Sequence, residues 1–155
     1  MILDASVAAK WFLSDEDMTI EALAVRDALV TERIRLAAPP AIWTEVGNGI
    51  VRAVRRRLLD ATDAISLADE ARELSRLIGV VRVDIGEIVR TALSVGIGTY
   101  DAEYLAAALQ EGSSVITADQ GMLERGRAHG YDVVWLGDVT LRDGVLVDTP
   151  QGYQG

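Results

Sequence analysis

Four acidic residues, spread over most of the chain, have the type and setting to carry chemistry. Asp4 ends the apolar run MIL, Asp119 follows the run VIT, and Glu45 and Asp101 lie in segments with helical apolar spacing. Carboxylates that gather in one place repel one another at neutral pH, and a divalent cation keeps such a group ionised and ordered. Ligand sets made only of oxygen favour magnesium or manganese. If the four acids converge, the sequence predicts an Mg²⁺ or Mn²⁺ site.

Each of these acids also suits an ordinary structural role. Asp4 and Asp101 are typical helix N-caps, and Asp119 fits a turn that begins the next helix. Glu45 fits a solvated position on its helix. The arrangement of the surrounding elements therefore decides between four separate roles and one shared site.

Short strand-like runs alternate with longer helical patterns along the chain, which predicts an α/β fold with a parallel sheet. The expected strands are Met1–Leu3, Arg35–Ala38, Val80–Val83, Ser114–Thr117 and Asp132–Leu136. The expected helices are Ser6–Leu13, Met18–Thr31, Pro40–Arg57, Ala61–Leu77, Ile85–Val95, Asp101–Glu111 and Gln120–Ala128.

On this frame, two of the acids fall at the edge where open α/β sheets bind ligands. Asp4 and Asp119 each follow the carboxyl end of a parallel strand, and they converge if the first and fourth strands are neighbours. Asp101 lies at the border of the apolar stripe of its helix, and Glu45 shares one helix face with Gly49 and Arg52. The pattern of residues leaves the adjacency of the two strands open.

Composition limits the classes of protein that remain. A chain of 155 residues, 50% apolar and 25% charged, suits one compact domain. The absence of cysteine excludes thiolate nucleophiles, zinc–thiolate sites and disulfides, and it fits a reducing compartment. No stretch has the length of a membrane span, and no signal-peptide pattern opens the chain. We therefore expect a soluble, cytoplasmic protein.

The formal net charge of −9 argues against binding nucleic acid by bulk attraction, so any such contact must be local or bridged by cations. A basic run at the end of the Glu45 helix offers a local site. These arginines either compensate the helix dipole or contact RNA phosphates or an acidic partner segment: Arg52, Arg55, Arg56 and Arg57.

Four stretches, in order along the chain, resemble the motifs of PIN-domain ribonucleases of the VapC type, the toxin half of bacterial toxin–antitoxin pairs. They are ILDASVAAKWFL, APPAIWTEVGNGI, TYDAEYLAAAL and VITADQGML. The resemblance covers residues 1–136 and implies a PIN-like, five-stranded parallel sheet in the order 3-2-1-4-5, flanked by helices. That order sets the first and fourth strands side by side. The acids that match the family's metal-binding positions are Asp4, Glu45, Asp101 and Asp119, with Ser6 and Thr117 as supporting hydroxyl residues.

The resemblance also implies an activity and partners. It implies an Mg²⁺- or Mn²⁺-dependent endoribonuclease in which metal-activated water attacks the phosphodiester. The implied partners are an RNA substrate, a VapB-type antitoxin and a second copy of the chain. Trp11, Phe12 and Leu13 either pack in the core or line a groove for the antitoxin. Tyr100 and Tyr104, beside Asp101, either close the core or stack on bases.

The last residues depart from the minimal family pattern. We interpret residues 1–136 as the PIN domain and residues 137–155 as an extension of it. Within the extension, Asp143-Gly144 between VTL and VLV predicts a short hairpin, followed by a flexible tail.

Other functions fit the sequence less well. A phosphoacceptor signalling domain normally has paired acids after its first strand and a lysine after its fifth. Here Ala5 follows Asp4, and the single lysine is Lys10, on the first helix. A catalytically silent binding scaffold stays an alternative, but the intact set of four acids disfavours it. A PIN-domain RNA-processing nuclease outside any toxin–antitoxin pair remains the main alternative.

Overall fold

A five-stranded parallel sheet forms the centre of the molecule. The computed structural model describes residues 1–13, 17–142 and 145–148. The strands are β1 (Ile2–Leu3), β2 (Ala37–Ala38), β3 (Gly79–Val80), β4 (Val115–Thr117) and β5 (Val133–Trp135). Their order is β3-β2-β1-β4-β5, and every pairing between them is parallel, which confirms the expected topology.

The register of β1 against β4 brings two parts of the predicted site together, one at the end of each strand. Ile2 pairs with Val115 and Leu3 pairs with Ile116, so Asp4 and Thr117 come next at the same edge of the sheet. The backbone N–H of Asp4 donates to the carbonyl of Ile116 at 3.1 Å, which extends the pairing by one residue. The strand order therefore supplies the adjacency that the residue pattern leaves open.

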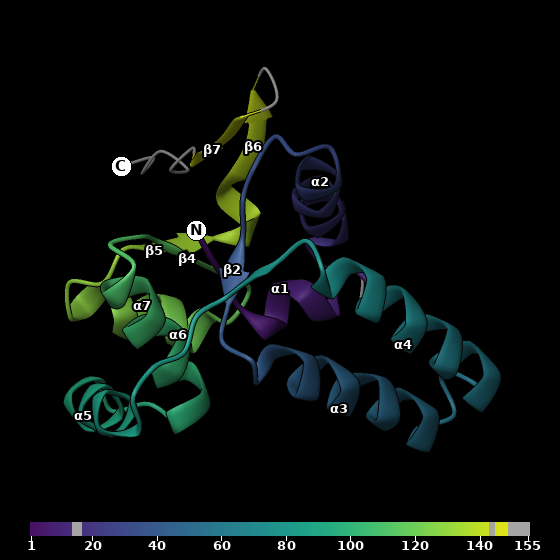
Figure 1. The fold of residues 1–155 in the computed structure, drawn as a ribbon, viewed down its shortest axis with the longest axis horizontal. Coiled ribbons are helices and arrows are strands. Elements are labelled where there is room, and N and C mark those ends of the chain that lie inside the picture. Colours follow the sequence, from purple (N-terminus) through teal and green to yellow (C-terminus); the bar gives the residue numbers. More distant parts are fainter. Residues whose placement is uncertain (14–16, 143–144, 149–155) are drawn as a thin grey trace.

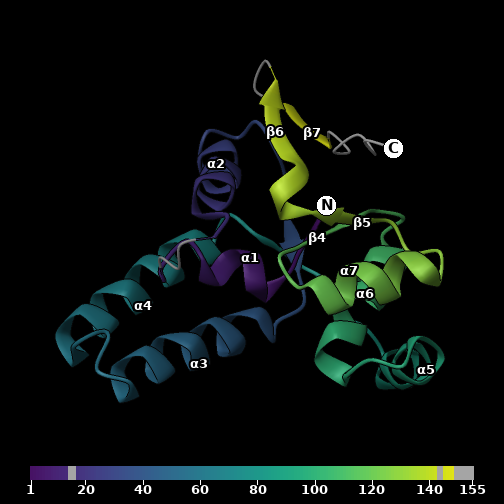
Figure 2. The ribbon, with the colours of Figure 1, turned by 180° about the vertical axis from the view of Figure 1, so that it is seen from behind.

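Helices cover both faces of this sheet (Figures 1 and 2). One side carries the first group: α1 (Ala5–Ala9), α2 (Thr19–Val30), α3 (Ile42–Arg55) and α4 (Ala61–Ser75). The other side carries α5 (Ile85–Val95), α6 (Thr99–Gln110) and α7 (Gln120–Ala128). Because right-handed crossovers link parallel strands, the first and second groups lie on opposite faces.

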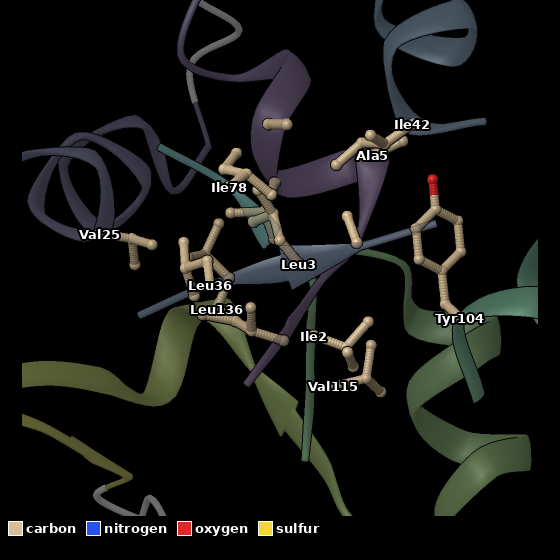
Figure 3. Packing of buried hydrophobic residues seen from close by; sticks show 14 of the residues in the cluster. Ile2, Leu3, Ala5, Val25, Leu36, Ile42, Ile78, Tyr104, Val115 and Leu136 are labelled. Atoms are coloured by element: carbon tan, nitrogen blue, oxygen red, sulfur yellow. The ribbon is translucent and has the colours of Figure 1, made fainter. Parts of the chain in front are cut away.

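The hydrophobic core centres on β1 and β4. Ile2, Leu3 and Val115 are at most 1% exposed, and they pack against side chains from the flanking helices (Figure 3). The core-facing side of α6 is rich in alanine, with Ala102 and Ala107 completely buried. Small side chains let this helix lie close to the sheet, which holds its first turn near the ends of β1 and β4.

The helices α3 and α4 form an antiparallel arm that extends away from the sheet (Figure 1). The arm is attached through an apolar ridge of α3, where Ile42, Val46 and Ile50 are buried. Helix α1 packs against α3 at Gly49, where an added Cβ would lie 3.2 Å from Cδ1 of Leu13. Leu13 lies beyond the end of α1, so a side chain at Gly49 would require the end of the Leu13 side chain to shift by a few tenths of an ångström.

Several predicted boundaries differ from the structure. The strand expected at Arg35–Ala38 pairs only over Ala37–Ala38, and the strand expected at Val80–Val83 is found at Gly79–Val80, so it begins one residue earlier and ends three residues earlier. Helix α6 begins at Thr99, two residues before the expected start, so Asp101 lies in its first turn and Gly98 is the N-cap.

The C-terminal hairpin is present and forms its own sheet. The strands β6 (Val139–Arg142) and β7 (Val145–Asp148) pair antiparallel after a short 3₁₀ turn over Leu136–Asp138. The predicted turn residues Asp143-Gly144 and the predicted tail at residues 149–155 lie outside the described residues.

Candidate active site

Asp4 stands at the centre of a hydroxyl network at the end of β1. Its side chain is 4% exposed, and Oδ2 accepts hydrogen bonds from Ser6 Oγ and from Thr117 Oγ1, the latter at 2.7 Å. Asp4 occupies the N-cap position of α1, yet its side chain makes no capping hydrogen bond. The simple N-cap role therefore does not explain this carboxylate.

The two hydroxyls are themselves held by the loop after β4. The backbone N–H of Ala118 donates to Ser6 Oγ at 2.9 Å, and that of Asp119 donates to Thr117 Oγ1, also at 2.9 Å. Both hydroxyls thus accept from the β4 loop and donate to Asp4. This network locks one carboxylate between elements that are more than one hundred residues apart in sequence.

Burial without a compensating positive charge makes Asp4 a weak acid. Burial raises the pKa of Asp4 to about 6, the hydrogen bonds from Ser6 and Thr117 act to lower it, and the charges of Asp101 and Asp119 raise it further. The two neighbouring acids affect Asp4 because they face the same space. The structure thus brings carboxylates from β1, α6 and the end of β4 into one electrostatic field.

Glu45 reaches the same space from the first turn of α3. Its Oε1 accepts a hydrogen bond of 2.7 Å from the hydroxyl of Tyr104, a residue of α6 that is 1% exposed. Figure 3 shows the Tyr104 hydroxyl pointing towards the start of α3 near Ile42. Burial raises the pKa of Glu45, the Tyr104 hydrogen bond lowers it, and the charges of Asp4 and Asp101 raise it.

Asp101 and Asp119 are the more accessible members of the group. Burial raises the pKa of the half-buried Asp101, the charge of Asp119 adds to that effect, and the charge of Arg125 opposes it. Asp119 is exposed and caps α7, because its Oδ1 accepts from the backbone N–H of Met122 at 2.8 Å. Asp119 is therefore the N-cap of α7 and also lies close enough to Asp4 and Asp101 for its charge to act on both.

Comparison with known proteins identifies the family of this arrangement. A family profile described as PIN domain matches residues 1–128. The chain belongs to the PIN-domain family. Ribonuclease VapC3 of Pyrobaculum aerophilum is 27% identical to this PIN domain over 129 residues, which are 81% of the chain and 93% of that protein.

Two solved structures share the fold of this PIN domain. PAE2754 from Pyrobaculum aerophilum superposes with a TM-score of 0.66 at 22% identity, covering 88% of each chain. FitAcB from Neisseria gonorrhoeae superposes with a TM-score of 0.60 at 19% identity, covering 85% of this chain and 94% of that one. No helix within the described ranges has the length and apolar character to cross a membrane.

The donor chemistry of the site in this PIN domain fits a hard divalent cation, because the converging groups are all carboxylates. Within the described part of the chain, no three acidic or imidazole groups are close enough to form a ready-made coordination sphere. Mg²⁺ characteristically keeps several waters and binds through one or two carboxylates together with substrate phosphates. An open group of acids around one fixed carboxylate, Asp4, suits that mode of binding.

The basic run at the end of α3 divides into two pairs. Arg52 and Arg56 line a groove between α1 and α3, together with Glu45 and Ser6, whereas Arg55 and Arg57 are not among the groove residues. The resemblance suggested a partner groove near the end of α1. Phe12 and Leu13 do line this groove, but the adjacent Trp11 is buried and its indole N–H donates to the Ala22 carbonyl at 2.9 Å.

Three residues near the acids were missed as site residues in the sequence. Tyr104 was expected to close the core or stack on bases, and it is indeed buried, but its hydroxyl also holds Glu45. The charge of Glu103 raises the pKa of Glu45, and the charge of Arg125 lowers the pKa of Asp101. Of the two roles open for Tyr100, closure of the core is wrong, since this side chain is exposed. The adjacency of Glu103 and Tyr104 to Asp101 was the one sequence signal for either residue.

Proposed function

We propose that this PIN domain is an endoribonuclease that depends on Mg²⁺ or Mn²⁺ and hydrolyses RNA phosphodiester bonds. The observation that carries the proposal is Asp4: a carboxylate buried beside other acids, held by two hydroxyls and accompanied by no salt bridge within the described residues. A buried charge without a partner is costly, so a cation is the expected complement.

In the proposed reaction the residues of the chain position the cation and the substrate. Asp4, Glu45, Asp101 and Asp119 would hold the cation, which when bound lowers the pKa of water and offsets charge on the displaced oxygen. Ser6 and Thr117 fix the orientation of Asp4, and Tyr104 fixes that of Glu45. One oxygen of Asp119 caps the first turn of α7, so its other oxygen is the one that would bind the cation.

We infer further that the nuclease is a VapC-type toxin of the cytoplasm, paired with a VapB-type antitoxin and assembled as a homodimer. The named relative, a ribonuclease VapC3, supports the toxin role because the match spans 93% of that protein. An RNA-processing nuclease without an antitoxin is the alternative, since the same acids would serve it equally well.

Metal dependence is the direct test of the activity. Purified protein is expected to cleave single-stranded RNA with Mg²⁺ or Mn²⁺ and to stop in excess EDTA, while its circular dichroism spectrum stays unchanged. Cleavage that persists undiminished in EDTA contradicts the proposal. Loss of the spectrum in EDTA would instead show that the cation supports the fold.

Growth separates the toxin from the processing enzyme. Induced expression in a bacterium is expected to arrest translation, and coexpression of the adjacent antitoxin gene is expected to relieve the arrest. Harmless expression of soluble, active nuclease supports the processing role. Sedimentation of the purified protein tests the dimer.

A further inference from the structure

The groove between α1 and α3 begins at the acidic site and changes charge along its length. It encloses about 670 Å³ and is lined by Ser6 and Glu45 and by the cations Lys10, Arg52 and Arg56. Apolar side chains complete the lining, from the end of α1 and the turn after α3: Phe12, Leu13, Leu58 and Leu59. A ligand in this groove would therefore touch the candidate site and the arginines at once.

One face of α3 carries the change of charge. Glu45, Gly49, Arg52 and Arg56 follow at intervals of four, three and four residues, which is the spacing of side chains on one helix face. At 1.5 Å per residue, Arg52 lies about 10 Å and Arg56 about 16 Å along the helix from Glu45. Gly49 adds no side chain between them, so the groove continues past it.

The charge of the lining favours an extended polyanion. Glu45 is the sole acid among the described residues of the groove, against three cations, although the whole chain carries a formal net charge of −9. The ammonium of Lys10 also donates to the carbonyl of Asp17 at 3.1 Å, which restrains it on the α1 side. Dipole compensation at the end of α3 does not account for this arrangement by itself, because Arg52 and Arg55 both lie in the last turn of α3 and only Arg52 lines the groove.

We propose that a single strand of RNA reaches the acidic site along this groove, with Arg52 and Arg56 contacting phosphates of the same strand at a distance from the bond that is cut. This inference rests on the proposed ribonuclease function and adds the path of the substrate. Cationic grooves that follow the backbone are the usual way to bind single strands without reading their sequence. Arg55 and Arg57 then contribute only to the general charge of the arm.

The test compares two double variants that lose the same charge from the same run. Arg52→Gln/Arg56→Gln removes the groove pair, and Arg55→Gln/Arg57→Gln removes the pair outside it. Binding of a labelled single-stranded RNA is measured by anisotropy in EDTA over a range of salt concentrations, and cleavage of the same RNA is measured with Mg²⁺. Circular dichroism and melting temperature confirm that both variants are folded.

Loss of two phosphate contacts is expected to reduce the salt slope of binding by about 1.4 and to weaken binding about 20-fold at 0.1 M salt. KM should rise with little change in kcat, since binding to phosphates away from the reacting bond stabilises ground and transition states alike. The Arg55/Arg57 variant should retain the wild-type slope and KM.

The possible outcomes are distinct. Equal losses in the two variants overturn the groove path and leave only general charge. Wild-type RNA affinity in the Arg52/Arg56 variant also overturns it and assigns the groove to another occupant, such as an acidic segment of a protein partner. Failure of the wild type itself to bind or cleave RNA defeats the proposed function, and this inference falls with it.

Discussion

The strand side and the helix side of the acidic site are built differently. On the strand side, Asp4 is buried and its carboxylate is fixed by Ser6 and Thr117, whose hydroxyls are held in turn by backbone N–H groups. On the helix side, Glu45 has one fixed partner, Tyr104, and Asp101 stands half-buried near Arg125. The strand side is held by a buried network of hydrogen bonds, whereas the helix side is less buried and Glu45 is held by the single hydroxyl of Tyr104.

This difference predicts unequal consequences when the two sides are perturbed. A change to the fixed carboxylate should remove the anchor of the site. Changes to the hydroxyls that hold the acids should alter the orientation of those acids, and the strand side should be the more sensitive because its network is buried.

The largest expected effect comes from Asp4→Asn. The amide keeps the shape of the side chain but removes the negative charge, so RNA cleavage at saturating Mg²⁺ should fall by two or more orders of magnitude. The fold should persist, as judged by circular dichroism and melting in EDTA. Asp60→Asn is the matched control, because the exposed Asp60 caps α4 at 2.8 Å and Asn caps a helix equally well.

An Asp4→Asn protein that cleaves RNA at the wild-type rate would show that Asp4 is no ligand. A variant that melts far below the wild type would show that this carboxylate serves the fold instead.

The second effect concerns the pH dependence of stability without metal. The pKa of Asp4 lies at about 6 in the folded protein, above the value of 3.8 of an unperturbed carboxyl. The folded state therefore holds this proton more tightly, and the stabilisation is complete below about pH 4 and is lost as pH rises to about 6. The unfolding free energy in EDTA should fall over that window by up to about 3 kcal/mol.

Urea denaturation at several pH values between 4 and 7 measures this change. Asp4→Asn should make the unfolding free energy depend less steeply on pH. The remaining pH dependence should have the same sign, because burial raises the pKa of Glu45 and Asp101 too. A wild-type stability that rises with pH over this window would contradict the raised pKa of Asp4.

The smallest effects are expected when the hydroxyls that hold the acids are removed, on the strand side and on the helix side. Thr117→Val leaves Asp4 without one donor and the Asp119 N–H without its acceptor, and should cost about 1 to 3 kcal/mol of stability. Tyr104→Phe removes only the hydroxyl that holds Glu45. Changes to groups that orient ligands typically cost about 10–100-fold in metal affinity or activity, and Thr117→Val should lie nearer the upper end.

Mn²⁺ affinity, measured by calorimetry, and kcat together test this order. Tyr100→Phe is the control for Tyr104→Phe, because Tyr100 is an exposed tyrosine on the same helix. A larger loss from Tyr104→Phe than from Thr117→Val would reverse the comparison and make the helix side the anchor.

Some residues of the site could be predicted from the sequence and others could not. Asp4 and Asp119 were recognisable because each follows a short apolar run, and parallel strands share one edge for their carboxyl ends. The pairing of β1 with β4, and the role of Glu45, came from resemblance to PIN-domain ribonucleases. The hydrogen bond between Tyr104 and Glu45 joins side chains 59 residues apart, and no local pattern records such a contact.

The exact strand boundaries also could not be predicted from local sequence. The strand-like run at residues 80–83 predicts a strand of that length, but β3 covers only Gly79–Val80, the two residues that pair with Ala37 and Ala38 of β2. Apolar character marks a segment that can enter a sheet. The neighbouring strand decides how much of it does so.

The pairing of β1 with β4 has a consequence for the protein during its synthesis. Ile2 and Leu3 of β1 pair with Val115 and Ile116 of β4, which are synthesised more than one hundred residues later. Contacts so distant in sequence form late and slowly. The hydroxyl of Thr117 reaches Asp4 only at that stage, so a chain still on the ribosome would lack the assembled site. A growing chain would thus lack the proposed nuclease activity until most of the domain has been translated.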